Sequence, residues 1–202
     1  EIMKVIDADA HVIESESAWD YMLESERQYR PRIVGAASGD PAINYWHIDG
    51  RLMPRSNVEK NLPEAARDMS DLSIRLKHMD ELGIDIQVIY PTIFIFPTAR
   101  RAEVDLAICR SYNRWMADIV AKAPDRFRWV VVPPLLNMAR VADELQLGKE
   151  HGACGVYSSA TFENASVIVS APVWPLVLPC VTPVTMTSFI LRTRNSCWPL
   201  PA

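Results

Sequence analysis

An alternation of strand-like and helix-like segments along residues 4–157 restricts the fold of this chain more than any other feature. Short apolar segments read as strands, and amphipathic segments between them read as helices. The predicted strands are residues 4–9, 84–90, 127–132 and 152–157, and the predicted helices joining them are residues 72–82, 102–122 and 139–148. Such alternation is typical of a parallel sheet whose strands are joined by crossover helices.

The helix before the second strand has the clearest period. Leu72, Leu76, Met79 and Leu82 recur at intervals of three or four residues, which places them on one helical face. Gly83 follows, where a helix stop is expected. The third predicted strand, by contrast, is almost entirely apolar, as expected of a parallel strand buried on both faces.

No sustained period is visible in residues 24–68, which follow a short helix expected at residues 18–23. Proline and glycine interrupt the segment repeatedly. A long irregular stretch inside a compact domain often forms a lid or a pocket wall. Arg51 in this segment is a candidate to hold the carboxylate of a substrate. The alternative interpretation is that Arg51 is simply solvated.

A carboxylate and an imidazole lie two residues apart at the end of the first predicted strand. Because side chains alternate along a strand, Asp9 and His11 point to the same side. An oxygen and a nitrogen ligand in this arrangement suit a divalent metal such as Zn²⁺. Glu14 follows, near enough to orient a ligand or hold a water. The alternative is a buried strand with a capping acid, since D-x-H is short and arises by chance.

Thr92, Phe94 and Phe96 follow the second predicted strand, which Pro91 ends. Barrel-type α/β folds place substrate contacts at the carboxyl ends of their strands. Thr92 and Phe94 are therefore candidates for substrate binding. Ordinary packing explains the two aromatic side chains equally well.

Composition and motif content exclude several classes of function. A net charge of −4 without a basic stripe argues against nucleic acid as a partner. There is no G-x-G-x-x-G after the first strand and no G-x-x-x-x-G-K-[ST] anywhere, so a nucleotide-binding fold loses its usual support. The four cysteines share no C-x-x-C spacing, as expected of reduced thiols in a cytoplasmic protein. Charged residues near the start argue against a signal peptide.

Six short motifs, taken in order, carry a family resemblance. They are IDADAHVIE at residues 6–14, MDELGID at 79–85, YPT at 90–92, YNRW at 112–115, PDRF at 124–127 and GACGV at 152–156. In this order and spacing they resemble the amidohydrolase-related superfamily. The branch they resemble contains metal-dependent decarboxylases and hydrolases similar to aminocarboxymuconate-semialdehyde decarboxylase and γ-resorcylate decarboxylase.

This resemblance implies a (β/α)8 TIM barrel that binds one divalent metal, often zinc. Asp9 and His11 correspond to the metal ligands of the family's first strand. The family completes its site with a histidine after strand five, another after strand six and an aspartate after strand eight. The implied reaction is decarboxylation of a small unsaturated or aromatic carboxylate, or hydrolysis of a related compound.

Only the first four βα units of such a barrel are expected, in residues 1–157, because resemblance and composition both change after Tyr157. Residues 158–202 contain six prolines, and no histidine or aspartate follows His151. We expect an irregular, Pro-rich apolar tail there. Three interpretations of this tail are open. It is the product of a shifted reading frame or of an alternative end, it is a divergent tail that packs on the half-barrel or on a partner, or it is a membrane segment over residues 164–191. Interior prolines argue against a membrane helix.

The truncated motif set also limits the expected chemistry. A catalytic zinc usually takes three protein ligands, and only two are predicted here. We therefore expect weak metal binding and little decarboxylase activity, with a non-catalytic half-barrel fragment as the alternative function. Unpaired edges on the first and fourth strands of a half-barrel favour pairing with another chain, so a homo-oligomer is a further expectation.

Overall fold

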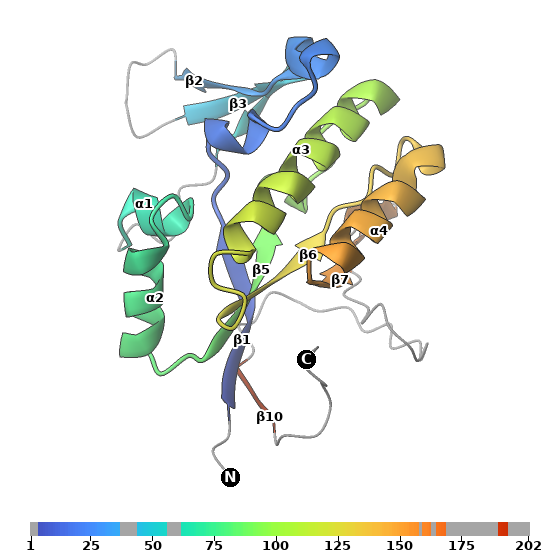
Figure 1. Cartoon of the computed structure of the whole chain (residues 1–202). Helices are drawn as coiled ribbons and strands as arrows, with labels where there is room; N and C mark the ends of the chain where they lie inside the picture. The colour runs from blue at the N-terminus through green and yellow to red at the C-terminus, as the bar shows by residue number, and fades with distance from the viewer. Residues whose placement is uncertain are drawn as a thin grey trace.

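The computed structural model describes residues 4–36, 44–55, 62–157, 159–162, 165–168 and 190–193. Its centre is a five-stranded sheet with the order β10-β1-β5-β6-β7 (Figure 1). The strands are β1 (Lys4–Val12), β5 (Ile86–Pro91), β6 (Phe127–Val131), β7 (Ala153–Val156) and β10 (Ile190–Thr193). Neighbours among β1, β5, β6 and β7 pair in parallel, whereas β10 pairs antiparallel with β1. The parallel sheet predicted from the alternation is confirmed.

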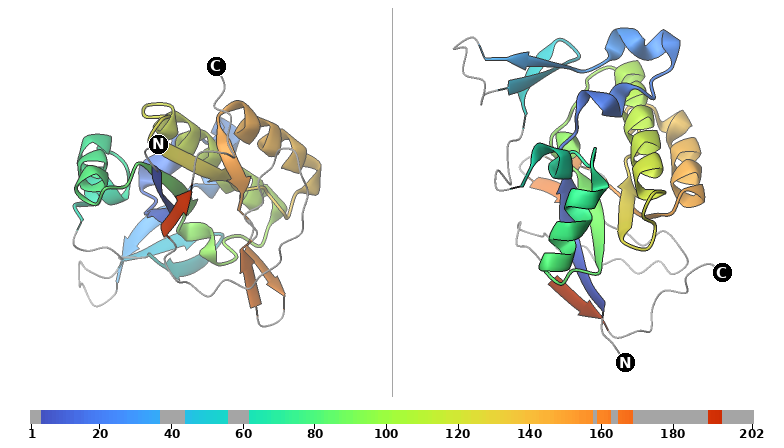
Figure 2. Two further views of the ribbon diagram at one scale, coloured as in Figure 1. Left: turned by 90° about the horizontal axis from the view of Figure 1, so that it is seen from below. Right: turned by 60° about the vertical axis from the view of Figure 1, so that its left-hand side comes forward.

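The connecting helices also follow the prediction to within a few residues. They are α2 (Leu72–Glu81), α3 (Ala102–Val120) and α4 (Val141–Glu150), and a short α1 (Glu64–Arg67) precedes them. Helices α3 and α4 lie side by side against the sheet, while α1 and α2 lie beside β1 (Figures 1 and 2). Short 3-10 helices occur at η1 (Glu16–Trp19), η2 (Glu24–Tyr29), η3 (Ile93–Ile95) and η4 (Met138–Arg140).

Helix α3 is buried on most of its surface because η1 and η2 cover the side that faces away from the sheet. The Ser111 hydroxyl donates to the Ala18 carbonyl at 2.7 Å, and Arg110 donates to the Glu26 carboxylate at 2.7 Å. Tyr112 and Asn113 are completely buried. The YNRW motif is therefore part of the packing of α3.

The described part of residues 24–68 is not irregular, contrary to the prediction. It contains a three-stranded antiparallel sheet of β2 (Arg32–Gly35), β3 (Asn44–Ile48) and β4 (Arg51–Pro54). Asp49 and Gly50 form the turn between β3 and β4, with φ of 49° and 72°. Two consecutive positive φ angles are the geometry for which Asp-Gly is preferred in tight hairpins. The strands were missed because four or five residues are too few to establish a period.

Two smaller expectations also differ from the structure. The helix expected at residues 18–23 is instead the single turn η1, and Leu82 is 59% exposed although it continues the apolar stripe of α2. Helix α2 ends at Glu81, and Gly83 with φ of 66° turns the chain away. Leu82 therefore lies beyond the packed face, whereas Met79 is completely buried.

The tail after Tyr157 contains short strands rather than only irregular chain. β8 (Ser159–Phe162) and β9 (Ala165–Ile168) form an antiparallel pair, and β10 covers the edge of β1 from Lys4 to Asp7. The edge expected to be free on the first strand is thus paired over this length, while β7 ends the sheet on the other side. Most of residues 164–191 lies outside the described residues. Within the described ranges, no helix has the length and apolar character needed to cross a membrane.

Gly148 allows α4 to approach the sheet closely. A Cβ added at Gly148 would lie 3.0 Å from Cβ of Val131 and 3.3 Å from Cβ of Ala153. We predict that Gly148→Ala destabilises the fold by about 1 kcal/mol, because the overpacking exceeds the gain in helix propensity. Urea unfolding measures this free energy.

The matched control for this prediction is the same change in a Val131→Ala background. Removing the Val131 methyl groups abolishes the contact with Cγ2 at 3.2 Å and leaves the contacts with the two Cβ atoms, so Gly148→Ala should there be less destabilising than in the wild type. An equal cost in both backgrounds would show that close approach to Val131 is not the reason for the glycine.

Candidate functional site

The side chains of Asp9 and His11 converge near the carboxyl end of β1. Nδ1 of His11 lies 3.1 Å from the carbonyl oxygen of Pro91, and a carbonyl can only accept, so this nitrogen carries the proton. In the neutral imidazole the lone pair is therefore on Nε2, which lies 3.7 Å from Oδ1 of Asp9. The side chains are 20% and 42% exposed for His11 and Asp9. Both are accessible to a ligand.

An irregularity in β1 aims these two side chains. The register of β1 against β5 shifts between Asp7 and Ala10, as in a β-bulge. Asp7 accepts from the backbone N–H of Asp9 at 3.1 Å and from Nε2 of Gln87 at 3.0 Å. Ala10 and Val12 remain buried on either side of His11. Asp7 is therefore bonded to Gln87 on β5, while the side chains of Asp9 and His11 approach one another.

Arg75 extends this polar group and was not predicted. Its Nε donates to Oε1 of Gln87 at 2.9 Å, and its Nη2 donates to the carbonyl of His11 at 3.0 Å. The side chain is 5% exposed. A charged residue three positions after Leu72, on the apolar stripe of α2, is the sequence signal that marks it. Arg75 thereby ties α2 to the backbone of the candidate ligand.

Glu14 is almost completely buried and holds the turn after β5. Its two carboxylate oxygens accept from the backbone N–H groups of Thr92, at 2.9 Å, and Ile93, at 3.0 Å. Burial raises its pKa to about 7, although these hydrogen bonds favour the charged form. Since Pro91 accepts from His11, Glu14 fixes the same turn that anchors the imidazole.

Of the remaining predicted residues, Thr92 and Phe94 lie at this turn and Arg51 does not. Oγ1 of Thr92 is 3.5 Å from Nδ1 of His11. Phe94 is 5% exposed and its ring meets that of Tyr112 at 5.3 Å, so its surroundings are those of a packed core residue. Phe96 is 65% exposed. Arg51 lies on β4, where Nη1 reaches the carbonyl of Pro97 at the long distance of 3.5 Å.

Comparison with known proteins identifies the fold of this chain. No protein-family model and no curated protein sequence matches the chain. An amidohydrolase from Mycobacterium avium subsp. paratuberculosis matches with a TM-score of 0.56 and 15% identity, over 76% of this chain and 48% of that chain. The chain has an amidohydrolase fold. The resemblance predicted from its motifs is thereby confirmed at the level of the fold.

Other amidohydrolase-related structures match as well. 5-Carboxyvanillate decarboxylase from Sphingomonas paucimobilis has a TM-score of 0.50 and 18% identity, over 80% of this chain and 44% of that chain. A dihydroxybenzoic acid decarboxylase from Polaromonas, solved with manganese and 2-nitroresorcinol, has a TM-score of 0.43 and 20% identity over 77% and 38%, too distant to inform this site. The chain spans less than half the length of each of these proteins.

The described part of this amidohydrolase fold brings no third ligand to Asp9 and His11. Among the described residues there is no group of three His, Cys, Asp or Glu side chains arranged to hold a metal ion. His47 lies on β3, His78 on α2 and His151 at the end of α4. The two strand residues are therefore the only part of a ligand set that these residues provide.

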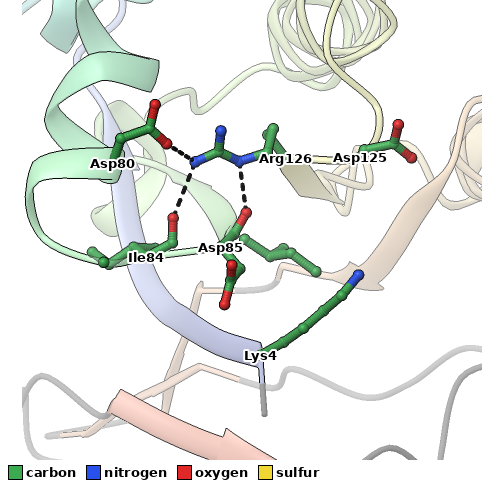
Figure 3. Close-up of a pocket in the computed structure, with 8 residues that line it drawn as sticks. Lys4, Asp80, Ile84, Asp85, Asp125 and Arg126 are labelled. Atoms are coloured by element: carbon green, nitrogen blue, oxygen red, sulfur yellow. Dashed lines mark hydrogen bonds and ion pairs between the residues drawn. The ribbon is translucent and has the colours of Figure 1, made fainter. Parts of the chain in front are cut away.

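A cavity of about 420 Å³ lies at the opposite, amino-terminal end of the sheet (Figure 3). Arg126 fills one side of it, with its guanidinium bonded to Asp80 at 2.7 Å and to the carbonyl oxygens of Ile84 and Asp85 at 3.1 and 2.8 Å. These bonds join the PDRF and MDELGID motifs. In barrel folds this end of the strands serves stability, whereas chemistry occurs at the carboxyl ends, so the cavity does not belong to the candidate site.

Proposed function

We propose that this chain is an amidohydrolase-related protein in which Asp9 and His11 bind a divalent metal at the carboxyl end of β1. The anchored tautomer of His11 carries this proposal. Nδ1 of His11 donates its proton to the carbonyl oxygen of Pro91, so in the neutral ring the lone pair of Nε2 is available to a metal ion beside Asp9. Residues 1–157 then correspond to the first half of a (β/α)8 barrel, with residues 158–202 as a separate tail.

The donor pair fits a metal in both chemistry and spacing. Metal–nitrogen and metal–oxygen bonds to zinc are about 2.0–2.2 Å long, so one ion can contact two donors about 4 Å apart or less. The 3.7 Å between Nε2 and Oδ1 meets this condition. A neutral imidazole with its other nitrogen bonded to a carbonyl is the usual form of a histidine ligand. We propose zinc as the metal, with manganese as the competing ion.

A divalent metal bound here supplies a positive charge that polarises a substrate oxygen or activates a water. We propose decarboxylation of a small aromatic or unsaturated carboxylate as the reaction, or hydrolysis of a related compound. The fold is supported by similarity to an amidohydrolase and to 5-carboxyvanillate decarboxylase. Arg51 and Thr92 are the proposed contacts to substrate, and Phe94 supports the turn of Thr92 from the core.

Glu14 acts in this proposal as a positioning residue. It holds the backbone of Thr92 and Ile93, and this turn presents the Pro91 carbonyl to His11. Partners that orient a ligand in this way contribute about 10–100-fold to metal affinity. The effect is indirect, because Glu14 has no bond to Asp9 or His11 among the described contacts.

Metal titration of the full 202-residue chain tests the proposal. We predict weak binding of Zn²⁺ or Mn²⁺, because two protein ligands are fewer than the three of a catalytic site. His11→Ala should weaken that binding at least about 10-fold, since a ligand contributes no less than a partner that orients it. Isothermal titration calorimetry measures the affinity and the stoichiometry.

His151→Ala is the matched control, because His151 is exposed at the end of α4 and should not change the affinity. Equal binding by wild type and His11→Ala would refute the metal site. Tight stoichiometric zinc together with turnover of a hydroxybenzoate would instead refute the expected impairment while leaving the metal site intact.

A further inference from the structure

Three buried polar groups flank the turn that anchors His11. Glu14, Tyr112 and Tyr157 are 1%, 0% and 2% exposed. They come from the segment after β1, from α3 and from the residue that follows β7. Burial, and then the nearby Glu14 carboxylate, raise the pKa of Tyr157 to about 12. Burial, followed by the charges of Glu14 and Tyr157, raises the pKa of Tyr112 well above its usual range. Contacts with residues 90–94 place the three groups around one short segment. Glu14 bonds the backbone of Thr92 and Ile93, the ring of Tyr112 meets that of Phe94 at 5.3 Å, and the ring of Tyr157 meets that of Tyr90 at 6.4 Å.

The hydroxyl groups of both tyrosines lack a hydrogen-bond partner within the part of the chain that the structure describes. The carboxylate of Glu14 accepts from the backbone N–H groups of Thr92, Ile93 and Glu14 itself, which leaves a lone pair for one further donor. A buried hydroxyl without a partner is destabilising, and buried polar groups of this kind are usually satisfied by ordered water.

We propose that the space between Glu14, Tyr112 and Tyr157 is an internal water site. Ordered water there bonds both tyrosine hydroxyls and donates to the Glu14 carboxylate. An internal water needs two to four polar partners, and these three side chains provide them. An apolar void would leave both tyrosine hydroxyls unsatisfied, and a direct bond from either of them to Glu14 is not among the described contacts.

This water lies next to the candidate metal site without depending on it. The ring of Tyr157 meets that of Tyr90 at 6.4 Å, and Tyr90 meets the ring of His11 at 6.0 Å. The proposed water site therefore adjoins the ring of Tyr157, which reaches the imidazole through Tyr90. Its formation requires only the folded chain, so it can be tested in the absence of metal.

Urea unfolding of Tyr112→Phe, Tyr157→Phe and the double variant tests the proposal. If water bonds both hydroxyls, each single change removes a satisfied hydrogen bond and raises the unfolding equilibrium constant about five-fold. The double variant should lose less than the product of the two single effects, because both hydroxyls bind the same water. Tyr21→Phe is the control, since its hydroxyl bonds Asp118 directly at 2.7 Å.

If no water binds the hydroxyls of Tyr112 and Tyr157, the two substitutions should have the opposite effect on the unfolding constant. Replacing an unsatisfied buried hydroxyl by hydrogen stabilises the fold, so a lower unfolding constant in both Phe variants would overturn the proposal. A crystal structure of the full chain provides the second measurement. Density for a water at about 2.7–3.2 Å from both hydroxyls supports the site. A direct bond from either tyrosine to Glu14, or a metal ion in place of water, refutes it.

Discussion

Replacing Glu144 by alanine is expected to destabilise the chain by about 3 kcal/mol, as for other buried ion pairs that lose one partner. Glu144 on α4 is 2% exposed. Its carboxylate accepts from Nδ2 of Asn113 at 2.9 Å and from Nη1 of Arg114 at 3.2 Å. Nε of Arg110 lies 4.0 Å from the same carboxylate. Without the carboxylate, the buried amide of Asn113 loses an acceptor, and Arg110 and Arg114, whose side chains are 11% and 35% exposed, lose a counter-charge.

The loss extends to the sheet, because Asn113 also bonds β6. Its Nδ2 donates to the carbonyl of Val132 and its Oδ1 accepts from the Val132 N–H, each at 2.9 Å. Glu144 therefore joins α4 to a side chain that already bridges α3 and the end of β6. Its removal should loosen the docking of α4 and lower the cooperativity of unfolding, which urea denaturation reports as a smaller slope.

Asp143→Ala is the matched control for Glu144→Ala. Asp143 is the neighbouring residue on α4, and its carboxylate pairs with Arg140 at 3.2 Å on the exposed surface. Such surface pairs contribute less than about 1 kcal/mol. A similar cost for the two substitutions would contradict the interpretation of Glu144 as a buried link between α3, α4 and the sheet.

The free energy of unfolding is expected to fall by about 3 kcal/mol as the pH rises from 4.5 to 8, on account of Glu14. Burial raises the pKa of Glu14 from 4.5 to about 7. The folded state therefore binds this proton more tightly than the unfolded state does. Its stabilising contribution is complete below pH 4.5 and is lost as the pH rises through 7.

Glu14→Gln isolates this contribution, because the amide does not titrate. Unfolding free energies of wild type and variant should be measured from pH 4.5 to 8. Other titrating groups are common to both proteins, so the difference between the curves reports Glu14 alone. The variant also loses one backbone hydrogen bond, which shifts its whole curve without changing the slope. Parallel curves would contradict a raised pKa at Glu14.

Much of the fold could be predicted from local pattern. The apolar run at residues 127–132 and the stripe of Leu72, Leu76 and Met79 each identify their element, because backbone geometry imposes the period directly on neighbouring residues. The hairpin of β3 and β4 had a signal as well, in Asp49-Gly50 between apolar flanks. Its strands were missed because segments of four or five residues are too short to establish an alternation of apolar and polar side chains.

The candidate site was predictable only in part. The D-x-H spacing identifies Asp9 and His11 because alternation along a strand is local. Their buried supports depend on contacts between distant segments. Glu14 bonds the backbone of Thr92, 78 positions along the chain, and His11 bonds Pro91, 80 positions along. No local period predicts either pairing.

The sequence alone determined the parallel βα architecture and the pair of residues proposed to bind metal, since both follow from repeats of two or 3.6 residues along the backbone. Only the tertiary structure decided which nitrogen of His11 is free, that Glu14 is buried, and that β10 covers the edge of β1. These features are hydrogen bonds and burial between segments far apart in sequence. These contacts form only when the helices and strands pack together, so the local sequence of one element does not predict them.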